Sequence, residues 1–418
     1  MVFEWGIDIE GSPLTRLLGT LSHKGRGEEN KEVSWAYLPN KIKKKIMKNV
    51  RQSNINIHKD AWVEINLEYL AQNIQAIKKT IPQGKKMMAI VKADAYGHGA
   101  QMLAQTMLAS GVDMFGVSSI DEGLDLRQVK IKAPILVVGA VPVWAIETAT
   151  QNDIAISVFN EAHLKACKEA YNRTGIKPKV HVKIDTGMNR IGVRIDEAVD
   201  FIEQVRNAKY LNFEGVFTHL ANAEEINATR EQVNAWNDIL AQIDKTNLLL
   251  HIQNTAGTFA YDVDSNMVRV GISLYGLYPD LPSGVKRPNL KQIMSLKGRI
   301  TNIHELRAGE GVSYGHTFTA YESTRVATIP IGYADGVSRS LSNKIEAEVN
   351  GERIRQIGNI TMDQMMFDLG DVEAQVGDVV TLLDEKDLSL DTWAEILGTI
   401  NYELTCRLKV RLPRVYTR

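Results

Sequence analysis

Short apolar runs alternate with longer helical patterns from about residue 56 to about residue 290 of this 418-residue chain. Strands that alternate with helices of 10 to 15 residues indicate βαβ units and parallel pairing. Eight such units close a (β/α)8 barrel. The eight runs are MMAIVK, MFGVSS, PILVVG, AISVF, KVHVKID, FEGVFTH, LLHIQN and MVRVG. We therefore predict an α/β fold with a TIM-like (β/α)8 barrel over residues 56–290. An open doubly wound sheet is the alternative, but it normally has fewer strands and a dinucleotide-type glycine turn, which KADAYGHG is not.

The pattern changes on both sides of this region. Residues 291–418 contain short alternating segments, which predict a mainly antiparallel β domain with one helix at LDTWAEIL. The expected strands there are GRITNIHEL, TRVATIPIGY, KIEAEVNG, DVVTLLD and RLKVRLP. Residues 1–55 have little periodicity and include the basic run KIKKKIMK, so we expect a flexible extension; an interaction tail and a true start at Met47 are the alternatives.

Charge and composition narrow the class of partner. The net charge is -1, which favours neither nucleic acid nor an anionic membrane surface. No apolar stretch approaches the roughly 20 residues of a spanning helix. Only two cysteines are present, too few for a disulfide framework or a zinc site, which favours a reducing, cytoplasmic location. We expect a small-molecule substrate and no metal site.

Five polar side chains follow the ends of predicted barrel strands. They are Lys92, Lys183, His219, Asn254 and Arg269. Barrel enzymes build their active sites at the carboxyl ends of the strands, so these side chains are expected to share one cleft.

Lys92 ends the apolar run MMAIVK, where burial would favour its neutral amine. Such an amine can hold a carbonyl cofactor as a Schiff base, and pyridoxal phosphate (PLP) is the obvious candidate. Barrels often bind phosphate with the loops after strands seven and eight. Those loops offer Asn254, Thr255, Gly271 and Ile272. Arg269, aimed at the pyridine nitrogen, would keep that nitrogen unprotonated and favour reversible proton transfer.

Several motifs resemble those of alanine racemases, which are fold-type III PLP enzymes, from about residue 56 to the end. AIVKADAYGHG resembles the PLP-lysine motif, which implies Lys92 as the Schiff-base lysine and Tyr96 near the phosphate. KIDTGMNRIG resembles the segment in which a lysine that is often carbamylated orients a substrate-binding arginine. FTHLA, GVSYGHTF and GNITMDQMM resemble the segments that carry a histidine bonded to the pyridine-facing arginine, the catalytic tyrosine and two substrate contacts. The implied residues are Lys183, Arg190, His219, Tyr314, Met362 and Asp363.

The resemblance implies interconversion of L-alanine and D-alanine, which supplies D-alanine for bacterial peptidoglycan. Racemisation needs a base on each face of the planar intermediate, which gives both Lys92 and Tyr314 a role. In the family this tyrosine reaches the neighbouring subunit's barrel, so the resemblance also implies a homodimer with shared sites.

One departure from the family pattern concerns Val410, which stands in KVRLPR where relatives commonly have tyrosine. We expect it to cost the phosphate a hydrogen bond and to loosen the pocket. A broader alanine and serine racemase therefore remains an alternative, as do a fold-type III decarboxylase and a non-catalytic PLP-binding barrel. His98, His251 and His316 are expected to be structural, and Asp94, Asp185, Asp335 and Asp363 lack a metal-ligand spacing.

Overall fold

The computed structural model describes residues 59–418. The predicted N-terminal extension, residues 1–55, lies outside the described residues. Two sheets account for most of the strands, and one continuous hydrophobic core includes side chains from both. A smaller cluster of Leu306, Val312, Ala320, Val326 and Ile357 lies within the second sheet's domain.

The first sheet is a nearly closed parallel barrel, as predicted. Its strands follow the order β10-β2-β3-β4-β5-β6-β8-β9, with the short β7 (Val193–Arg194) paired to β6. Between the two ends of this order, Asn266 N donates to Leu250 O (3.0 Å) and Arg269 N donates to Gln253 O (3.1 Å). The strands are β2 (Lys86–Ile90), β3 (Met114–Val117), β4 (Ile135–Val137), β5 (Ala155–Val158), β6 (Lys179–Asp185), β8 (Asn212–Phe217), β9 (Leu249–His251) and β10 (Met267–Val270).

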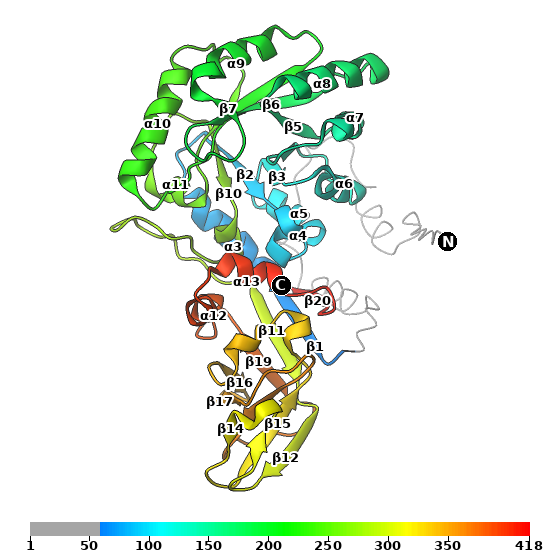
Figure 1. The fold of residues 1–418 in the computed structure, drawn as a ribbon, viewed down its shortest axis with the longest axis vertical. Coiled ribbons are helices and arrows are strands. Elements are labelled where there is room, and N and C mark those ends of the chain that lie inside the picture. The colour runs from blue at the N-terminus through cyan, green and yellow to red at the C-terminus, as the bar shows by residue number, and fades with distance from the viewer. Residues whose placement is uncertain (1–58) are drawn as a thin grey trace, which may run out of the picture. The chain divides into compact units, whose positions relative to one another are not determined.

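Helices cover the outside of the barrel (Figure 1). Ser119 and Asn160 cap two of them, because each side chain accepts a hydrogen bond from the backbone N–H three residues later. The helices are α3 (Leu67–Lys78), α4 (Lys92–Gly97), α5 (Ala100–Ala109), α6 (Ile120–Gln128), α7 (Ile146–Gln151), α8 (Glu161–Thr174), α9 (Ala198–Asn207), α10 (Ile226–Leu240) and α11 (Thr255–Ala260).

The second sheet has the order β12-β15-β18-β17-β16-β19-β11-β1-β20, and all its pairs are antiparallel except β1 with β20. Its strands are β1 (Ala61–Asn66), β11 (Met294–Arg299), β12 (Asn302–Leu306), β15 (Thr324–Ile329), β16 (Glu346–Val349), β17 (Glu352–Ile357), β18 (Met365–Asp368), β19 (Val379–Leu383) and β20 (Arg414–Thr417). A separate pair joins β13 (Gly311–Val312) to β14 (Phe318–Thr319). Strand β1 thus belongs to this sheet although it precedes the barrel in sequence. The division at residue 290 does not capture this, because a strand pattern does not reveal its pairing partner.

The C-terminal region differs from the prediction in two segments. GRITNIHEL is not one strand, because it contains the end of β11, a break at Ile300 and Thr301, and β12. The helix expected at LDTWAEIL is α12 (Leu390–Leu397), but RLKVRLP is not a strand. Helix α13 (Asn401–Arg407) ends there, a turn follows, and β20 begins only at Arg414. Alternating apolar residues over so short a segment fit a helix end and a turn equally well.

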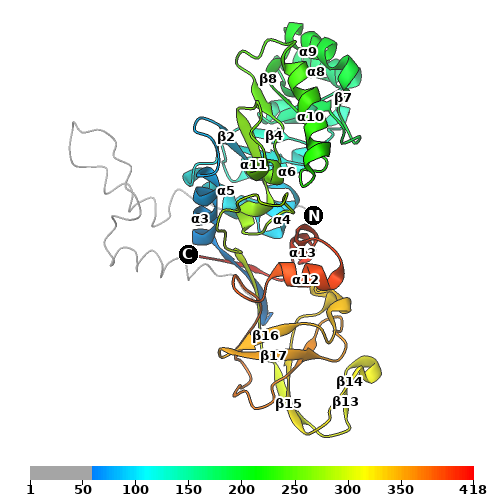
Figure 2. The ribbon, with the colours of Figure 1, turned by 90° about the vertical axis from the view of Figure 1, so that its left-hand side faces the viewer.

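Helix α13 packs against α4 (Figure 2), so the end of the chain returns to the barrel. Arg414 donates to Gly97 O from Nε (3.2 Å) and from Nη2 (3.1 Å). None of the helices within residues 59–418 is long and apolar enough to span a membrane.

Candidate active site

The segment after β2 turns with the opposite hand to an ordinary helix. Four consecutive residues, Ala93 to Tyr96, have φ between 53° and 55° and ψ between 40° and 51°. This conformation costs L-residues about 1–2 kcal/mol each. Lys92 stands at its start, so the strain is located where the predicted cofactor lysine leaves the strand.

Contacts both local and from later parts of the chain hold this turn. Ala93 N donates to Glu122 Oε1 and Ala100 N donates to Asp94 Oδ1, both at 2.7 Å. A Cβ on Gly97 would lie 2.4 Å from Thr405 O. The absence of that atom lets α13 approach the turn, which explains the glycine that follows Tyr96.

A cavity of about 390 Å³ opens at the carboxyl ends of the barrel strands. The structure brings most of the predicted site residues together on its wall: Lys92, Tyr96, Lys183, Arg190, His219, Asn254, Thr255, Arg269 and Gly271. Ile272 does not line the cavity but is buried beside Gly271 at the start of a 3-10 turn. The cavity thus joins residues from five barrel strand ends.

The two lysines of the cavity have lowered pKa values. Burial, followed by the charge of Arg190, lowers the pKa of Lys92. Burial, followed by the charge of Arg269, lowers the pKa of Lys183 to about 7. Both amines are therefore easier to obtain in the neutral, nucleophilic form than an ordinary lysine.

Arg269 is buried among neutral acceptors. Its guanidinium donates to the carbonyls of Thr218 (2.7 Å), His251 (2.7 Å) and Ile252 (3.0 Å). It also contacts His251 Nδ1 (2.9 Å) and His219 Nδ1 (3.2 Å). Within residues 59–418 it has no carboxylate partner, and burial lowers its pKa to about 9.

Because an arginine can only donate, both imidazoles must accept through Nδ1. Burial, followed by the charge of Arg269, holds the pKa of His219 and that of His251 well below the usual range. Both rings are therefore neutral and carry their proton on Nε2. His219 can then donate from Nε2 on the side away from Arg269.

The part of the cavity lined by Asn254, Thr255, Ala256 and Gly271 suits a phosphate. Asn254 caps α11, and Thr255 and Ala256 begin it, where backbone N–H groups have no partner inside the helix. Thr255 Oγ1 accepts from Gly271 N at 2.9 Å. A Cβ on Gly271 would lie 2.5 Å from Tyr96 Oη, so glycine keeps this corner open. The cavity therefore combines a low-pKa lysine, a buried arginine and an anion-binding corner, and these residues fit PLP.

Tyr314, Met362 and Asp363 do not line this cavity. Tyr314 is 75% exposed and Met362 is 53% exposed. Tyr314 nevertheless lies on a fixed turn, because Asn359 Nδ2 donates to its carbonyl at 2.6 Å and Ser313 Oγ donates to the carbonyl of Asn359 at 2.7 Å. These residues are thus exposed to solvent and are not part of the cavity that the chain's own Lys92 lines.

Family comparison agrees with both halves of the fold. Residues 65–279 match the model of the alanine racemase N-terminal domain, and residues 293–416 match that of the alanine racemase C-terminal domain. The chain belongs to the alanine racemase family. Racemases are isomerases, so this membership gives the reaction class.

Individual alanine racemases support the assignment over most of the chain. The alanine racemase of Nostoc sp. is 39% identical over 374 residues, which cover 85% of this chain and 95% of that protein. Alanine racemase 1 of Oceanobacillus iheyensis is 37% identical over 87% of this chain and 99% of its own length. The solved alanine racemase of Clostridium difficile 630 is 37% identical, has a TM-score of 0.82, and is matched over 86% of this chain and 96% of its own.

Sequence reasoning did not give Tyr402 or His251 a place at the racemase-family site. Tyr402 of α13 lines the cavity, and its ring centroid lies 6.0 Å from that of Tyr96. His251, expected to be only structural, contacts Arg269 directly. By contrast, Val410 is 92% exposed and does not line the cavity, so in a single chain it cannot loosen the pocket or remove a phosphate contact.

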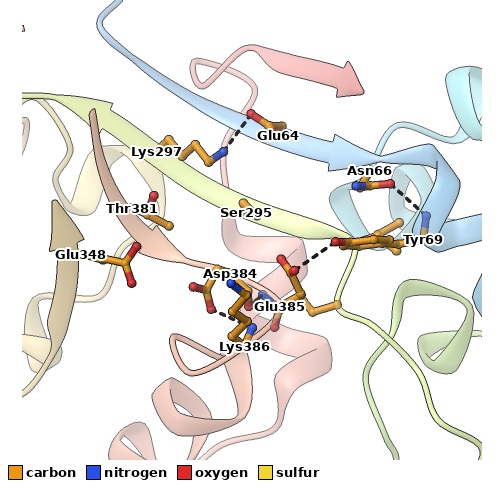
Figure 3. A pocket seen from close by; sticks show the side chains of 12 residues that line it. Glu64, Asn66, Tyr69, Ser295, Lys297, Glu348, Thr381, Asp384, Glu385 and Lys386 are labelled. Carbon is orange, nitrogen blue, oxygen red and sulfur yellow. Dashed lines mark hydrogen bonds and ion pairs between the residues drawn. The ribbon is translucent and has the colours of Figure 1, made fainter. Parts of the chain in front are cut away.

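A second cavity, of about 240 Å³, lies beside β1, β11 and β19 (Figure 3). Lys297 pairs with Glu64 at 3.1 Å, and Tyr69 Oη donates to Glu385 at 3.0 Å. None of the predicted site residues lines it. Its polar groups bond mainly to one another, so we assign it no part in the chemistry.

Proposed function

We propose that this protein interconverts L-alanine and D-alanine with PLP held by Lys92. The observation that carries the proposal is the cavity in which Lys92, Arg269 and the Gly271 corner meet. When bound, PLP would withdraw electrons from the substrate and make its α proton acidic. The cell-wall role and the cytoplasmic location stay predictions.

Lys92 is the base for one face of the substrate. Its lowered pKa makes the neutral amine easier to obtain than that of an ordinary lysine, so it can accept the α proton and return it. A single base would mostly return the proton to the face from which it came. Inversion therefore requires a second base on the opposite face.

Tyr314 is the second base in this proposal. A tyrosine with a reference pKa near 10 loses its proton more readily when a nearby hydrogen-bond donor or cation stabilises the phenolate. The neutral ring of His219, which Arg269 fixes through Nδ1, presents Nε2 for such a contact. Because Tyr314 is exposed on its own chain, we infer that it enters the cavity of a second copy. The enzyme is then a homodimer with two shared sites.

Arg190 would bind the substrate carboxylate. Its side chain lines the cavity and makes no ion pair with the part of the chain that the structure describes. A guanidinium can bind a carboxylate through two parallel hydrogen bonds. Met362 and Asp363, supplied by the partner with Tyr314, would complete the substrate contacts.

The direct test is to incubate the purified protein with L-alanine in deuterated water. We expect D-alanine to form with deuterium at the α carbon, and both to require PLP. L-Serine in a parallel reaction measures the breadth of specificity. Carbon dioxide release without D-alanine would instead identify a decarboxylase, and PLP binding without turnover would identify a non-catalytic module.

A further inference from the structure

Asp335 is a fully buried carboxylate at the base of the segment that carries Met362 and Asp363. Its Oδ2 accepts from Gly332 N at 2.9 Å. Its Oδ1 pairs with Lys59 and, at 3.0 Å, with Arg411 Nε. A buried charge is costly unless it is paired and hydrogen-bonded, and both oxygens of Asp335 meet that condition.

The turn that contains Asp335 holds the substrate-contacting segment by its backbone. Tyr333 N donates to Thr361 O and Ala334 N donates to Met362 O, each at 3.0 Å. A Cβ on Gly332 would lie 2.3 Å from Thr361 O, so only glycine allows this approach. The backbone at Thr361 and Met362 is therefore fixed directly against the Asp335 turn.

The side chain of Asp363 is fixed by a separate contact. Arg411 Nη2 donates to Asp363 Oδ1 at 2.5 Å, while Nε of the same guanidinium pairs with Asp335. The planar guanidinium therefore bridges a buried carboxylate and an exposed one. Lysine offers one ammonium group and cannot reproduce this two-sided geometry.

We propose that Arg411 is a positioning residue for substrate recognition, which transmits the fixed position of buried Asp335 to Asp363. This inference rests on the proposed function, because Asp363 matters only if its segment contacts substrate. Buried Asp335 forms an ion pair with Lys59, and Arg411 connects Asp335 to Asp363. Loss of the contact between Arg411 and Asp363 should weaken substrate binding while leaving PLP in place.

The first variant is Arg411→Lys, which keeps a cation beside Asp335 and releases Asp363. The pair is half exposed, so we expect a modest effect of roughly three- to tenfold on KM for L-alanine, with kcat changed less than KM. PLP content should match wild type. Arg353→Lys is the matched control, because Arg353 pairs with Asp387 at 3.3 Å in the same domain and does not contact the substrate segment.

A double-mutant cycle separates positioning from general stabilisation. In an Asp363→Asn background, Arg411→Lys should change KM less than twofold, because its contact partner is already altered. An unchanged KM in Arg411→Lys would overturn the proposal, as would equal effects of Arg411→Lys with and without Asp363. Arg411→Gln is the second variant if the lysine variant does not fold. If neither folds while Arg353→Lys does, Arg411 is a folding residue and the proposal is wrong.

The outcome also separates this inference from the proposed function. If the wild-type enzyme racemises serine but not alanine, alanine is not the substrate. A smaller effect of Arg411→Lys in the Asp363→Asn background, measured with serine, would still support the role of Arg411. Normal alanine racemisation with additive effects in the cycle would refute the role of Arg411 alone.

Discussion

Lys183 should react reversibly with carbon dioxide. The residue is 2% exposed, and its Nζ lies 5.1 Å from the centre of the Phe217 ring. Burial and the charge of Arg269 lower its pKa from 10.5 to about 7. At pH 8 about 90% of such an amine is neutral, against about 0.3% for an ordinary lysine, a difference of roughly 300-fold.

The positive charges around Lys183 favour its carbamate over its protonated amine. The neutral amine nitrogen attacks the carbon of carbon dioxide. The N–C bond forms as one C–O π bond breaks, and the nitrogen releases a proton to solvent, so a neutral amine becomes an anionic carbamate. The two arginines that disfavour a charged Lys183 would then stabilise its modified form, because the sign of the interaction reverses. The carbamate would also give Arg190 an anionic partner.

Carbon-13 nuclear magnetic resonance after equilibration with labelled bicarbonate checks this prediction. We expect one carbamate signal at pH 8 that declines on acidification through about pH 7, since protonation of the amine then competes. Lys183→Met should remove the signal. Lys179→Met, at a more exposed position on the same strand, should keep it. A wild-type protein without the signal, or a Lys183→Met variant that retains it, would refute the reasoning.

Two further predictions concern the cofactor corner and the shared site. Gly271→Ala places a methyl group 2.5 Å from Tyr96 Oη, so we expect PLP affinity, measured by fluorescence titration, to fall about tenfold or more for an overpacking cost of about 1–3 kcal/mol. Undiminished affinity would show that the corner does not hold the phosphate. Lys92→Ala and Tyr314→Phe should each be inactive, yet a verified heterodimer of the two should regain up to about half the activity per dimer, because one of its sites is intact. No recovery would place both bases in one chain.

The cavity residues that belong to the barrel could be predicted, because their positions at the ends of strands place them on one face. Lys92 and Arg269 stand at or near the ends of apolar runs, and parallel strands bring such ends to one face. Tyr402 could not be found this way. It reaches the cavity from α13, after the chain has crossed the second sheet, and no local pattern encodes that return.

The sequence also could not predict which strands pair with each other or which buried side chains make contact. Strand β1 looks like any half-buried strand, and its place between β11 and β20 depends on residues far along the chain. The contact of His251 with Arg269 joins side chains on adjacent barrel strands, where a lone histidine gives no sign of its partner. Only the folded register reveals such pairs.

The left-handed turn after Lys92 has a consequence for the timing of synthesis. Three groups that close around it, Thr405, Arg414 and Tyr416, come far later in the sequence and are translated long after it. Until they emerge, only the earlier contacts with Glu122 and within the segment offset the conformational cost of that turn. The amine of Lys92 is thus held by its full set of contacts only after the segment from Thr405 to Tyr416 has been made.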